Sequence, residues 1–523
     1  MKVVIVSLLT FLICAKGFAN PTFKERPNIV FFMVDDMGWQ DHSVPFHSSK
    51  WDYQGGYRTP HMERLAKSGI RFSQAYACSV CTPSRVSLLT GKNASRHHVT
   101  NWTARGETSH ASPELLPPSW RKEGLQPSHE STLPQLLQKA GYRTIHVGKA
   151  HWGAFDTPGA NPLHLGFTIN IAGNAAGQPG SYEGLDDYCI KMVKTNSVVT
   201  PPMPGMDSYL GKDIHLTDAL TDAACQQMEK AVANRNIPFF LHFAHYAVHT
   251  PWQPHRPHDV HYRNSKMSKA GIAYASMIEG VDASLGMIMQ KIKDLGIGEE
   301  TVLVFYSDNG GVRKGMRAID FPSSYRPRLR EGKGSAYEGG IRVPAMVSWV
   351  KPNPHRALQQ SFPIKGAAYC ERPIMIEDWF PTILRWAHSL PPENQQQDGD
   401  DLISLLANPS LAERSSSIIW HAPNVWAAYG VGDTSGYQPH SAIRAGDWKA
   451  IYFYESERWE LYHIADDQAE KNNLSEKNPV QLSKMSHQLY DHLQSMKSPW
   501  PVDRKTHQPR VMKLPLSTRK KTP

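Results

Sequence analysis

Cysteines, long apolar runs and a high density of charge are all scarce in this sequence. Six cysteines in 523 residues are far too few for a small scaffold held together by disulfides. After the N-terminal segment no run reaches the roughly 18 apolar residues that a membrane helix needs, so we do not expect an integral membrane protein. With 40% hydrophobic and 20% charged residues, the chain also lacks the composition of disordered proteins. These absences leave a globular protein that can bury a large core.

The positive charge of the chain is concentrated at its two ends. The formal net charge is +9 at pH 7, and residues 501–523 alone contribute +6. The first 19 residues contribute +2, so the remainder is nearly neutral. A surface for binding nucleic acid is therefore not indicated, and we expect residues 501–523 to form a loose basic tail.

Residues 1–19 have the pattern of a secretory signal peptide. Lys2 precedes an apolar run over residues 3–14, and the small residues Gly17 and Ala19 suit the positions before a cleavage site. We therefore expect a periplasmic or secreted protein. An odd number of cysteines then remains in an oxidising compartment, so at least one is unpaired or modified. They are Cys78, Cys81, Cys189, Cys225 and Cys370.

Short apolar runs alternate with helical patterns through most of the chain. The runs at residues 28–34, 144–147, 238–243 and 301–306 are short, mostly apolar and without alternation, which is typical of strands buried on both faces. Residues 277–292 repeat apolar side chains every three or four positions, which predicts a helix ending near Gly296. This alternation predicts an α/β fold with a large, mostly parallel sheet flanked by helices.

The composition changes after Pro391 and Pro392. Three strand-like segments follow, at residues 441–444, 448–454 and 459–463, and then an amphipathic helix over residues 482–496. Strands grouped together before a helix predict a small α+β subdomain. We therefore expect a signal peptide at 1–19, a catalytic domain at 20–400, a C-terminal subdomain with an antiparallel sheet plus helix at 401–500, and a basic tail at 501–523.

Polar side chains follow each of the four predicted parallel strands. Ligands bind outside the carboxyl ends of the strands in such sheets, so these side chains are candidates for one site. Asp35, Asp36, Asp308 and Asn309 offer hard oxygen ligands, which suit Ca²⁺ or Mg²⁺ rather than zinc. The other candidates are Lys149, His151, His245 and His249. A single acidic pair after a strand is often only a helix cap, but four polar strand ends together favour a site.

A zinc site is an alternative for the histidines. His242, His245 and His249 are spaced 3 and 4 apart, which would align them on one side of a helix. The apolar start of this segment and the Thr250-Pro251 step at its end favour a strand followed by a loop instead.

Residues 81–92 form the most distinctive segment. Pro83 suits the first turn of a helix and Gly91 its C-terminal stop, so Cys81 lies at the helix N-terminus, where backbone N–H groups favour an anionic group. Arg85 lies four residues further on and therefore returns to the same face of the helix. A buried or disulfide-bonded cysteine, with Cys78 nearby, is the alternative interpretation.

An ordered set of motifs resembles the formylglycine-dependent sulfatases of the alkaline-phosphatase-like superfamily. Cys81-x-Pro-x-Arg85 followed by Leu-Thr-Gly91 resembles the segment in which the family's cysteine is oxidised to an aldehyde during export. Further matches follow in the family's order: Gly-Lys-x-His at residues 148–151, His-Thr-Pro at 249–251, Ser-Asp-Asn-Gly at 307–310, Gly-Lys-Gly at 332–334 and Tyr-Glu-Gly-Gly at 337–340. Residues 443–464 also resemble the family's small end domain.

The resemblance implies a sulfuric ester hydrolase whose nucleophile is Cys81 converted to 3-oxoalanine (formylglycine) and then hydrated. A formylglycine-generating maturation enzyme is the implied partner. The implied Ca²⁺ ligands are Asp35, Asp36, Asp308, Asn309 and the modified Cys81. In the implied reaction Arg85 and His151 hold the hydrated aldehyde, Lys149 and Lys333 clamp the sulfate oxygens, and His249 protonates the leaving alcohol.

Residues 171–182 resemble those of bacterial polysaccharide sulfatases, so the implied substrate is a sulfated glycan or its oligosaccharides. Three alternatives stay open: an arylsulfatase of broad specificity, a formylglycine-dependent phosphonate or phosphate ester hydrolase, and a non-catalytic glycan-binding protein. A two-zinc phosphatase would need more metal ligands and a Thr or Ser nucleophile. A glycan-binding protein on a decayed scaffold would have lost site residues, and none is lost here.

Long segments at residues 40–56 and 154–211, rich in Gly, Pro, Asn and Asp, are expected to be loops that wall the site. Four tryptophans near the strand ends are as well suited to stacking on sugars as to packing in a loop core. They are Trp39, Trp51, Trp152 and Trp252. Ala150 stands where the family often has Trp, with Trp152 on the other side of His151, and we expect this departure to reshape the pocket wall.

Overall fold

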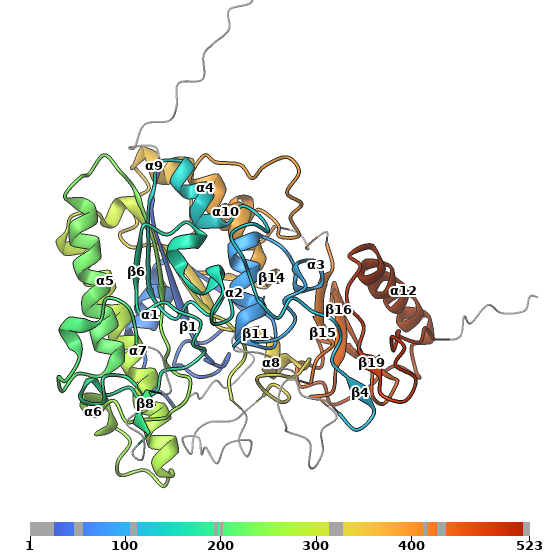
Figure 1. Cartoon of the computed structure of the whole chain (residues 1–523). Coiled ribbons are helices and arrows are strands. Elements are labelled where there is room, and N and C mark those ends of the chain that lie inside the picture. The colour runs from blue at the N-terminus through green and yellow to red at the C-terminus, as the bar shows by residue number, and fades with distance from the viewer. Residues whose placement is uncertain are drawn as a thin grey trace, which may run out of the picture.

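The computed structural model describes residues 26–515 except 47–55, 105–111, 190, 193–196, 199–201, 313–327, 412–413, 415 and 426–435. The expected signal peptide at residues 1–19 and Trp51 lie outside the described residues, as do residues 516–523. Figure 1 shows a large twisted sheet with helices on both sides and a smaller sheet beside it, towards the C-terminal end of the chain.

The large sheet has eight strands in the order β13-β2-β12-β10-β1-β9-β5-β6. Its centre is formed by β10 (Thr301–Ser307), β1 (Asn28–Val34), β9 (Phe239–Ala244) and β5 (Arg143–Gly148), which are parallel to one another. The two edges are β13 (Ala368–Cys370) and β6 (Ile169–Ile171), and β2 (Ile70–Phe72) lies next to β13 inside the sheet. Only β12 (Ala345–Trp349) runs antiparallel to its neighbours in this sheet. The predicted α/β fold with a mostly parallel sheet is confirmed.

Helices cover both faces of this sheet because each face is apolar. On one side lie α1 (Pro60–Ser68), α5 (Leu216–Val232) and α7 (Lys269–Asp294), and on the other lie α2 (Cys81–Thr90), α4 (Leu133–Lys139) and α10 (Trp379–Trp386). Leu65, Leu220 and Ile278 belong to the core on the first side. Val86 and Leu136 belong to the core on the second side. The central strands β1, β9 and β10 therefore contribute side chains to both cores.

Helix α7 is long and apolar enough, by length and composition, to cross a membrane. However, 83% of its most apolar window is buried inside the protein, and Ile278, Leu285 and Ile292 are among its fully buried residues. The helix ends at Asp294, close to the predicted stop at Gly296. Its apolar character is explained by packing against α5 and the sheet.

The small sheet is antiparallel, with the order β15-β16-β17-β18, and it packs against α12 (Pro479–Ser495). Strands β16 (His440–Ala445), β17 (Trp448–Phe453) and β18 (Arg458–His463) correspond to the three predicted segments. Strand β15 (Ile418–Ala422) was not predicted, because five residues without alternation carry too weak a pattern. The limits of the domains stay predictions. Leu405 and Leu406, which follow the expected limit at residue 400, pack in a core of the large sheet.

Two expectations about irregular segments are wrong. Residues 501–515 are not loose: β19 (Val502–Asp503) pairs with β4 (Leu115–Leu116), and Arg504 donates a hydrogen bond to the carbonyl of Ser112 at 2.9 Å. The segment 154–211 is more than a loop, because it supplies the edge strand β6 of the large sheet. In both cases pairing with a distant strand overrides a local sequence that is rich in turn formers or charge.

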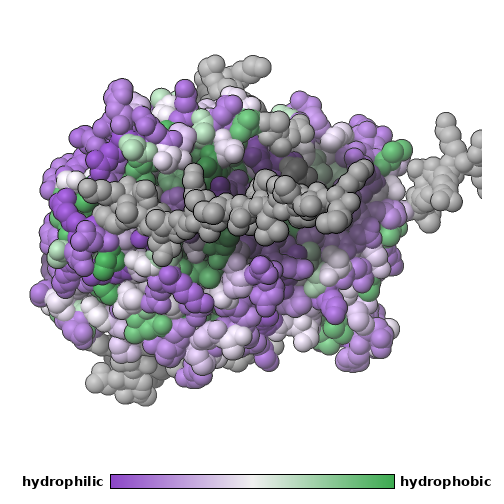
Figure 2. Space-filling model, turned by 90° about the horizontal axis from the view of Figure 1, so that it is seen from above, coloured by the Kyte–Doolittle hydropathy of each residue, from purple (hydrophilic) through white to green (hydrophobic). Residues whose placement is uncertain are grey.

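The described surface is mostly hydrophilic, with apolar residues scattered over it, as Figure 2 shows for one face. Further short elements connect the larger ones: α3 (Ala94–His97), α6 (Arg256–Asp259), α8 (Glu338–Ile341), α9 (Ala357–Ser361), α11 (Ile403–Ala407), β3 (Ala75–Tyr76), β11 (Arg342–Val343), β14 (Ile374–Met375), β7 (Lys191–Met192) and β8 (Ser197–Val198).

Candidate active site

The carboxyl ends of two neighbouring strands bring three aspartates together. Strands β1 and β10 are parallel and pair Val34 with Ser307, so the residues after them leave the sheet at the same edge. One carboxylate oxygen from each of Asp35, Asp36 and Asp308 lies within 4.8 Å of the others, and all three residues are fully buried. Asn309 joins them, because its Nδ2 donates to Asp36 Oδ1 at 2.8 Å.

Several oxygens of this cluster accept no hydrogen bond from any residue that the structure describes. They are Asp35 Oδ1, Asp36 Oδ2 and Asn309 Oδ1. A buried carboxylate oxygen without a partner costs free energy of folding, so these oxygens are suited to binding a cation. Burial and the neighbouring negative charge of Asp308 raise the pKa of Asp35 well above its usual value. The donor set consists of carboxylate and amide oxygens, which fits Ca²⁺, so this buried cluster can hold the predicted metal.

Three buried cations face the three carboxylates. Lys149 Nζ lies 2.6 Å from Asp35 Oδ2, and Lys333 Nζ lies 2.5 Å from Asp36 Oδ1. Burial opposes ionisation of Asp36, but Lys333, His249, Lys149 and the hydrogen bond from Asn309 together outweigh it and hold the pKa of Asp36 below its usual value. The guanidinium of Arg85 binds Asp308 Oδ2 at 2.8 Å. These three cations surround the carboxylates with positive charge. A sulfate group bound beside the carboxylates would be attracted by the same charges.

Cys81 begins helix α2, as the sequence predicts. Gly91 ends the helix in the left-handed conformation with φ 69°, which glycine adopts without strain. The Cys81 side chain is a free thiol and is only 4% exposed. Arg85 lies on the same side of the helix and also donates to the carbonyl of Lys149 at 2.8 Å. The alternative of a disulfide with Cys78 is wrong, since both cysteines carry free thiols.

His151 binds the Cys81 sulfur through one ring nitrogen. Its Nδ1 lies 3.3 Å from Cys81 Sγ, and its Nε2 lies 2.7 Å from the carbonyl oxygen of Thr103. A carbonyl only accepts, so the neutral ring carries its proton on Nε2 and presents an unprotonated Nδ1 to position 81. Burial, together with the nearby charge of Lys149, lowers the pKa of His151 well below its usual value and keeps the ring neutral.

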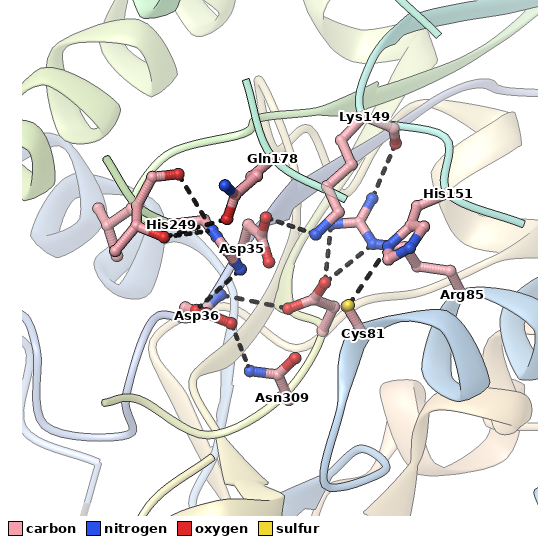
Figure 3. A network of polar contacts seen from close by, with 12 residues as sticks. Asp35, Asp36, Cys81, Arg85, Lys149, His151, Gln178, His249 and Asn309 are labelled. Carbon is pink, nitrogen blue, oxygen red and sulfur yellow. Dashed lines mark hydrogen bonds and ion pairs between the residues drawn. The ribbon is translucent and has the colours of Figure 1, made fainter. Parts of the chain in front are cut away.

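His249 faces the aspartates from the other side of the site. Its Nε2 lies 3.7 Å from Asp36 Oδ2, and its Nδ1 lies 3.1 Å from the carbonyl oxygen of Thr250. Figure 3 shows His249 and Asp36 at one side, Cys81, His151 and Arg85 at the other, and Asp35 with Lys149 between them. The structure thus brings together most of the predicted site residues and leaves out His245; those it gathers are Asp35, Asp36, Asp308, Asn309, Cys81, Arg85, Lys149, His151, His249 and Lys333.

The alternative zinc site is wrong. His242 belongs to strand β9, and its Nδ1 lies 3.0 Å from Nδ1 of His146. His245 instead binds the hydroxyl of Ser284 through Nε2 at 2.9 Å. Because a strand and a loop do not repeat with the period of a helix, the three histidines point to three different partners.

Of the two roles left open for the tryptophans, stacking on sugars and packing in the core, the structure shows the core for Trp152. Its side chain is fully buried, stacks on Phe167 at 5.5 Å and donates from Nε1 to the carbonyl of Arg85 at 3.1 Å. Trp39 is 3% exposed and donates to the carbonyl of Ser73, so it is a core residue as well. Trp252 is half-buried and contacts Tyr274.

We expect Trp152→Ala to cost about 3–5 kcal/mol of stability, the range measured for removing a buried tryptophan. The variant also loses the hydrogen bond that holds the carbonyl of Arg85. A clear fall in the midpoint of thermal denaturation checks this, with Trp152→Phe expected to lose less. An unchanged midpoint would show that Trp152 does not support the site.

Residues 174–182 belong to the segment expected to wall the site, although none of them was given an individual role, and they contact both histidines. His151 donates from its backbone N–H to the carbonyl of Asn174 at 3.0 Å, and Tyr182 donates from its hydroxyl to the carbonyl of His249 at 2.9 Å. A side chain at Gly177 would lie 2.6 Å from the His151 ring, so only glycine fits there. The glycines of this segment were the available signal of such a close approach.

Comparisons with known proteins agree with this geometry. Residues 27–389 match the sulfatase family. A sulfatase from Formosa agariphila is 28% identical over an alignment 525 positions long, which covers 92% of this chain and 90% of that protein. Human N-acetylgalactosamine-6-sulfatase is 28% identical, with 91% of this chain and 80% of that protein covered.

Solved structures give the same result. The crystal structure of Ps i-CgsB matches with a TM-score of 0.69 and 26% identity, covering 90% of this chain and 93% of that chain. The complex of Ps i-CgsB with k-i-k-neocarrahexaose matches with a TM-score of 0.68 and 27% identity over 90% and 93% of the two chains. With a family match over more than half of its length and these residues gathered at one sheet edge, the chain belongs to the sulfatase family and is a sulfuric ester hydrolase.

Proposed function

We propose that this enzyme hydrolyses sulfate esters on sugar units of a sulfated polysaccharide or its oligosaccharides, with formylglycine at position 81 and Ca²⁺ at the aspartate cluster. The observation that carries the proposal is the placement of Cys81, at a helix N-terminus and beside His151, next to buried oxygens that lack a partner. This arrangement supports a modified nucleophile and a cation acting on one anionic group.

The chain's own residues account for binding of the sulfate. Asp35, Asp36, Asp308 and Asn309 would hold the metal ion, which supplies Lewis-acid polarisation of the sulfate oxygens when bound. Lys149 and Lys333 lie on the carboxylates that would ligate this ion, so their charges are available to the sulfate oxygens that bind beside it. Both lysines are buried, and cations in a site without water stabilise developing charge more strongly than exposed ones.

The residues around position 81 account for the nucleophile. Modification of Cys81 to the hydrated aldehyde supplies a hydroxyl nucleophile and, from its second hydroxyl, a route to expel sulfate by re-forming the carbonyl. The unprotonated Nδ1 of His151 faces position 81 and can take a proton from such a hydroxyl. Arg85 and the N-terminus of α2 stabilise negative charge at the same position.

His249 is placed to act on the leaving alcohol. It lies across the aspartates from Cys81, with Nε2 3.7 Å from Asp36 Oδ2. Burial and the charge of Lys333 lower the pKa of His249 well below its usual value, and the carboxylate of Asp36 only partly opposes this shift. Once the ring carries a proton on both nitrogens, a proton passed from Nε2 to the ester oxygen lets the sugar leave as a neutral alcohol.

We expect His249→Gln to reduce kcat/KM for a sulfated sugar by about 10²–10⁴-fold, the usual contribution of a general acid. The loss for 4-nitrophenyl sulfate should be smaller, because nitrophenolate leaves without a proton. Steady-state kinetics with both substrates measures this difference, with exposed His355→Gln as the control. Equal losses with the two substrates would remove His249 from the role of acid.

Two further features support a glycan substrate outside the cytoplasm. The segment 1–19 has the pattern of a signal peptide, so we propose a periplasmic or secreted enzyme that needs a formylglycine-generating maturation enzyme. The similar Ps i-CgsB was crystallised with k-i-k-neocarrahexaose, and another relative is named for N-acetylgalactosamine-6-sulfate. By analogy we place this chain among enzymes of sulfated polysaccharide degradation.

The test is a screen for release of inorganic sulfate from sulfated polysaccharides, their oligosaccharides and nitrophenyl or nitrocatechol sulfate. We expect at least one sulfated oligosaccharide to have the highest kcat/KM. If the aryl esters exceed every glycan, a general arylsulfatase is the correct description. Release of phosphate from matched aryl phosphates or phosphonates at a higher rate than sulfate would instead favour the phosphonate or phosphate ester hydrolase.

A further inference from the structure

Gln178 lies at the mouth of the site, on the segment that contacts both histidines. Its neighbour Gly177 packs on the His151 ring, and Pro179 on its other side is buried. The Gln178 side chain itself is exposed. Figure 3 shows it over the site between Lys149 and His249. A backbone held by contacts on both sides of Gln178 therefore presents one exposed amide at the entrance.

The orientation of this amide is set by one hydrogen bond. The hydroxyl of Thr250 donates to Gln178 Oε1 at 3.2 Å, and the same hydroxyl lies 3.2 Å from His249 Nδ1. With Oε1 occupied, the remaining polar atom is Nε2, which donates to no residue that the structure describes. The amide nitrogen is thus an available donor beside the imidazole that faces the leaving alcohol.

We propose that Gln178 determines specificity for the alcohol part of the substrate, by donating a hydrogen bond from Nε2 to an oxygen on the carbon next to the sulfated carbon. This deepens the proposed function and rests on its placement of the leaving alcohol at His249. Sugar rings carry an oxygen on nearly every carbon, so a sulfated sugar presents an acceptor at that distance from the ester. A simple phenyl or alkyl sulfate has none.

The experiment compares two aryl esters that differ in this one oxygen. In 4-nitrocatechol sulfate a hydroxyl lies on the carbon next to the ester, and in 4-nitrophenyl sulfate that hydroxyl is absent. We measure the ratio of their kcat/KM values in the wild type and in Gln178→Met, which keeps the length of the side chain but removes the donor. The electronic effect of the hydroxyl on the ester is common to both enzymes and cancels in the comparison.

We expect the preference for the catechol ester to fall about three- to tenfold in Gln178→Met, the usual effect of losing one neutral hydrogen bond. Gln178→Glu should lose at least as much, because it replaces the donor with a negative oxygen. The matched control is Gln290→Met, an exposed glutamine on α7. It should leave the ratio unchanged. A ratio that does not change in Gln178→Met overturns the proposal.

Two arms keep the test decisive. If turnover is too slow for kinetics, the dissociation constants of the two esters are compared in Cys81→Ala and in the double variant with Gln178→Met, and equal ratios there overturn the proposal as well. Failure of the glycan assignment is distinguishable, because a screen that finds no active glycan leaves the ratio test of Gln178 intact. An active glycan with an unchanged ratio rejects only the role of Gln178.

Discussion

Cys81→Ala is expected to abolish turnover, with kcat reduced by about 10⁴–10⁶-fold, as in other enzymes that lose their nucleophile. The alanine leaves the fold intact, because Cys81 contributes only a small buried side chain at the start of α2. It removes the one atom that faces the unprotonated Nδ1 of His151. Sulfate release by purified wild-type and variant enzyme measures the loss.

The chemical state of position 81 is the second readout of the same prediction. Mass spectrometry of the peptide that contains Cys81 should show an aldehyde when the enzyme is made in a host with the maturation enzyme, and a thiol when it is made without it. Enzyme with the thiol should be as inactive as Cys81→Ala. The matched control is Cys78→Ala, which removes another buried free thiol and should retain activity. Full activity with an unmodified Cys81 would reject the mechanism.

Removal of the metal ion is the other change expected to have a large effect. A chelator should reduce kcat/KM by about 10³-fold or more, since Lewis-acid stabilisation is worth several kcal/mol. Ca²⁺ should restore activity better than Zn²⁺, because the donors are hard oxygens. Asp308→Asn should behave like chelation, because it removes one carboxylate and the partner of Arg85.

A readout that does not depend on activity separates metal binding from catalysis. Ca²⁺ should raise the midpoint of thermal denaturation of the wild type, since an ion that binds only the folded state stabilises it. The shift should be absent in Asp308→Asn and present in Asp213→Asn, an exposed carboxylate paired with Arg256. Zinc bound in active enzyme, or a Ca²⁺ shift that survives Asp308→Asn, would contradict the assigned site.

Much of the fold is predictable from the sequence because its central strands are continuous apolar runs. Residues 28–34 match β1 at both ends, and 301–306 match β10 except for its last residue. Strand β2, with the sequence IRF, has only three residues. So short a run has no pattern of its own, and it becomes a strand only because β12 and β13 pair with it.

The site shows the same division between local pattern and distant contact. Asp35, Asp308 and Lys149 were predictable, because each directly follows a strand and parallel strands end at one edge. The place of Gln178 in the site was not predictable, because it depends on a hydrogen bond from Thr250, which is 72 residues away in the sequence. The sequence left open whether Trp152 stacks on a sugar or packs in the core, because the neighbours His151 and Trp152 can point to opposite sides.

The sequence by itself determined the order of the elements, the parallel sheet, the helix that begins at Cys81 and the residue types that can bind a cation and a sulfate. These follow from short-range rules: apolar periodicity, helix caps and the chemistry of side-chain oxygens. Only the tertiary structure decided which oxygens of Asp35 and Asp36 lack a partner, which nitrogen of His151 faces Cys81, and that Trp152 is core. Such features depend on atoms contributed by segments far apart in the chain, and no local pattern encodes the distance between them.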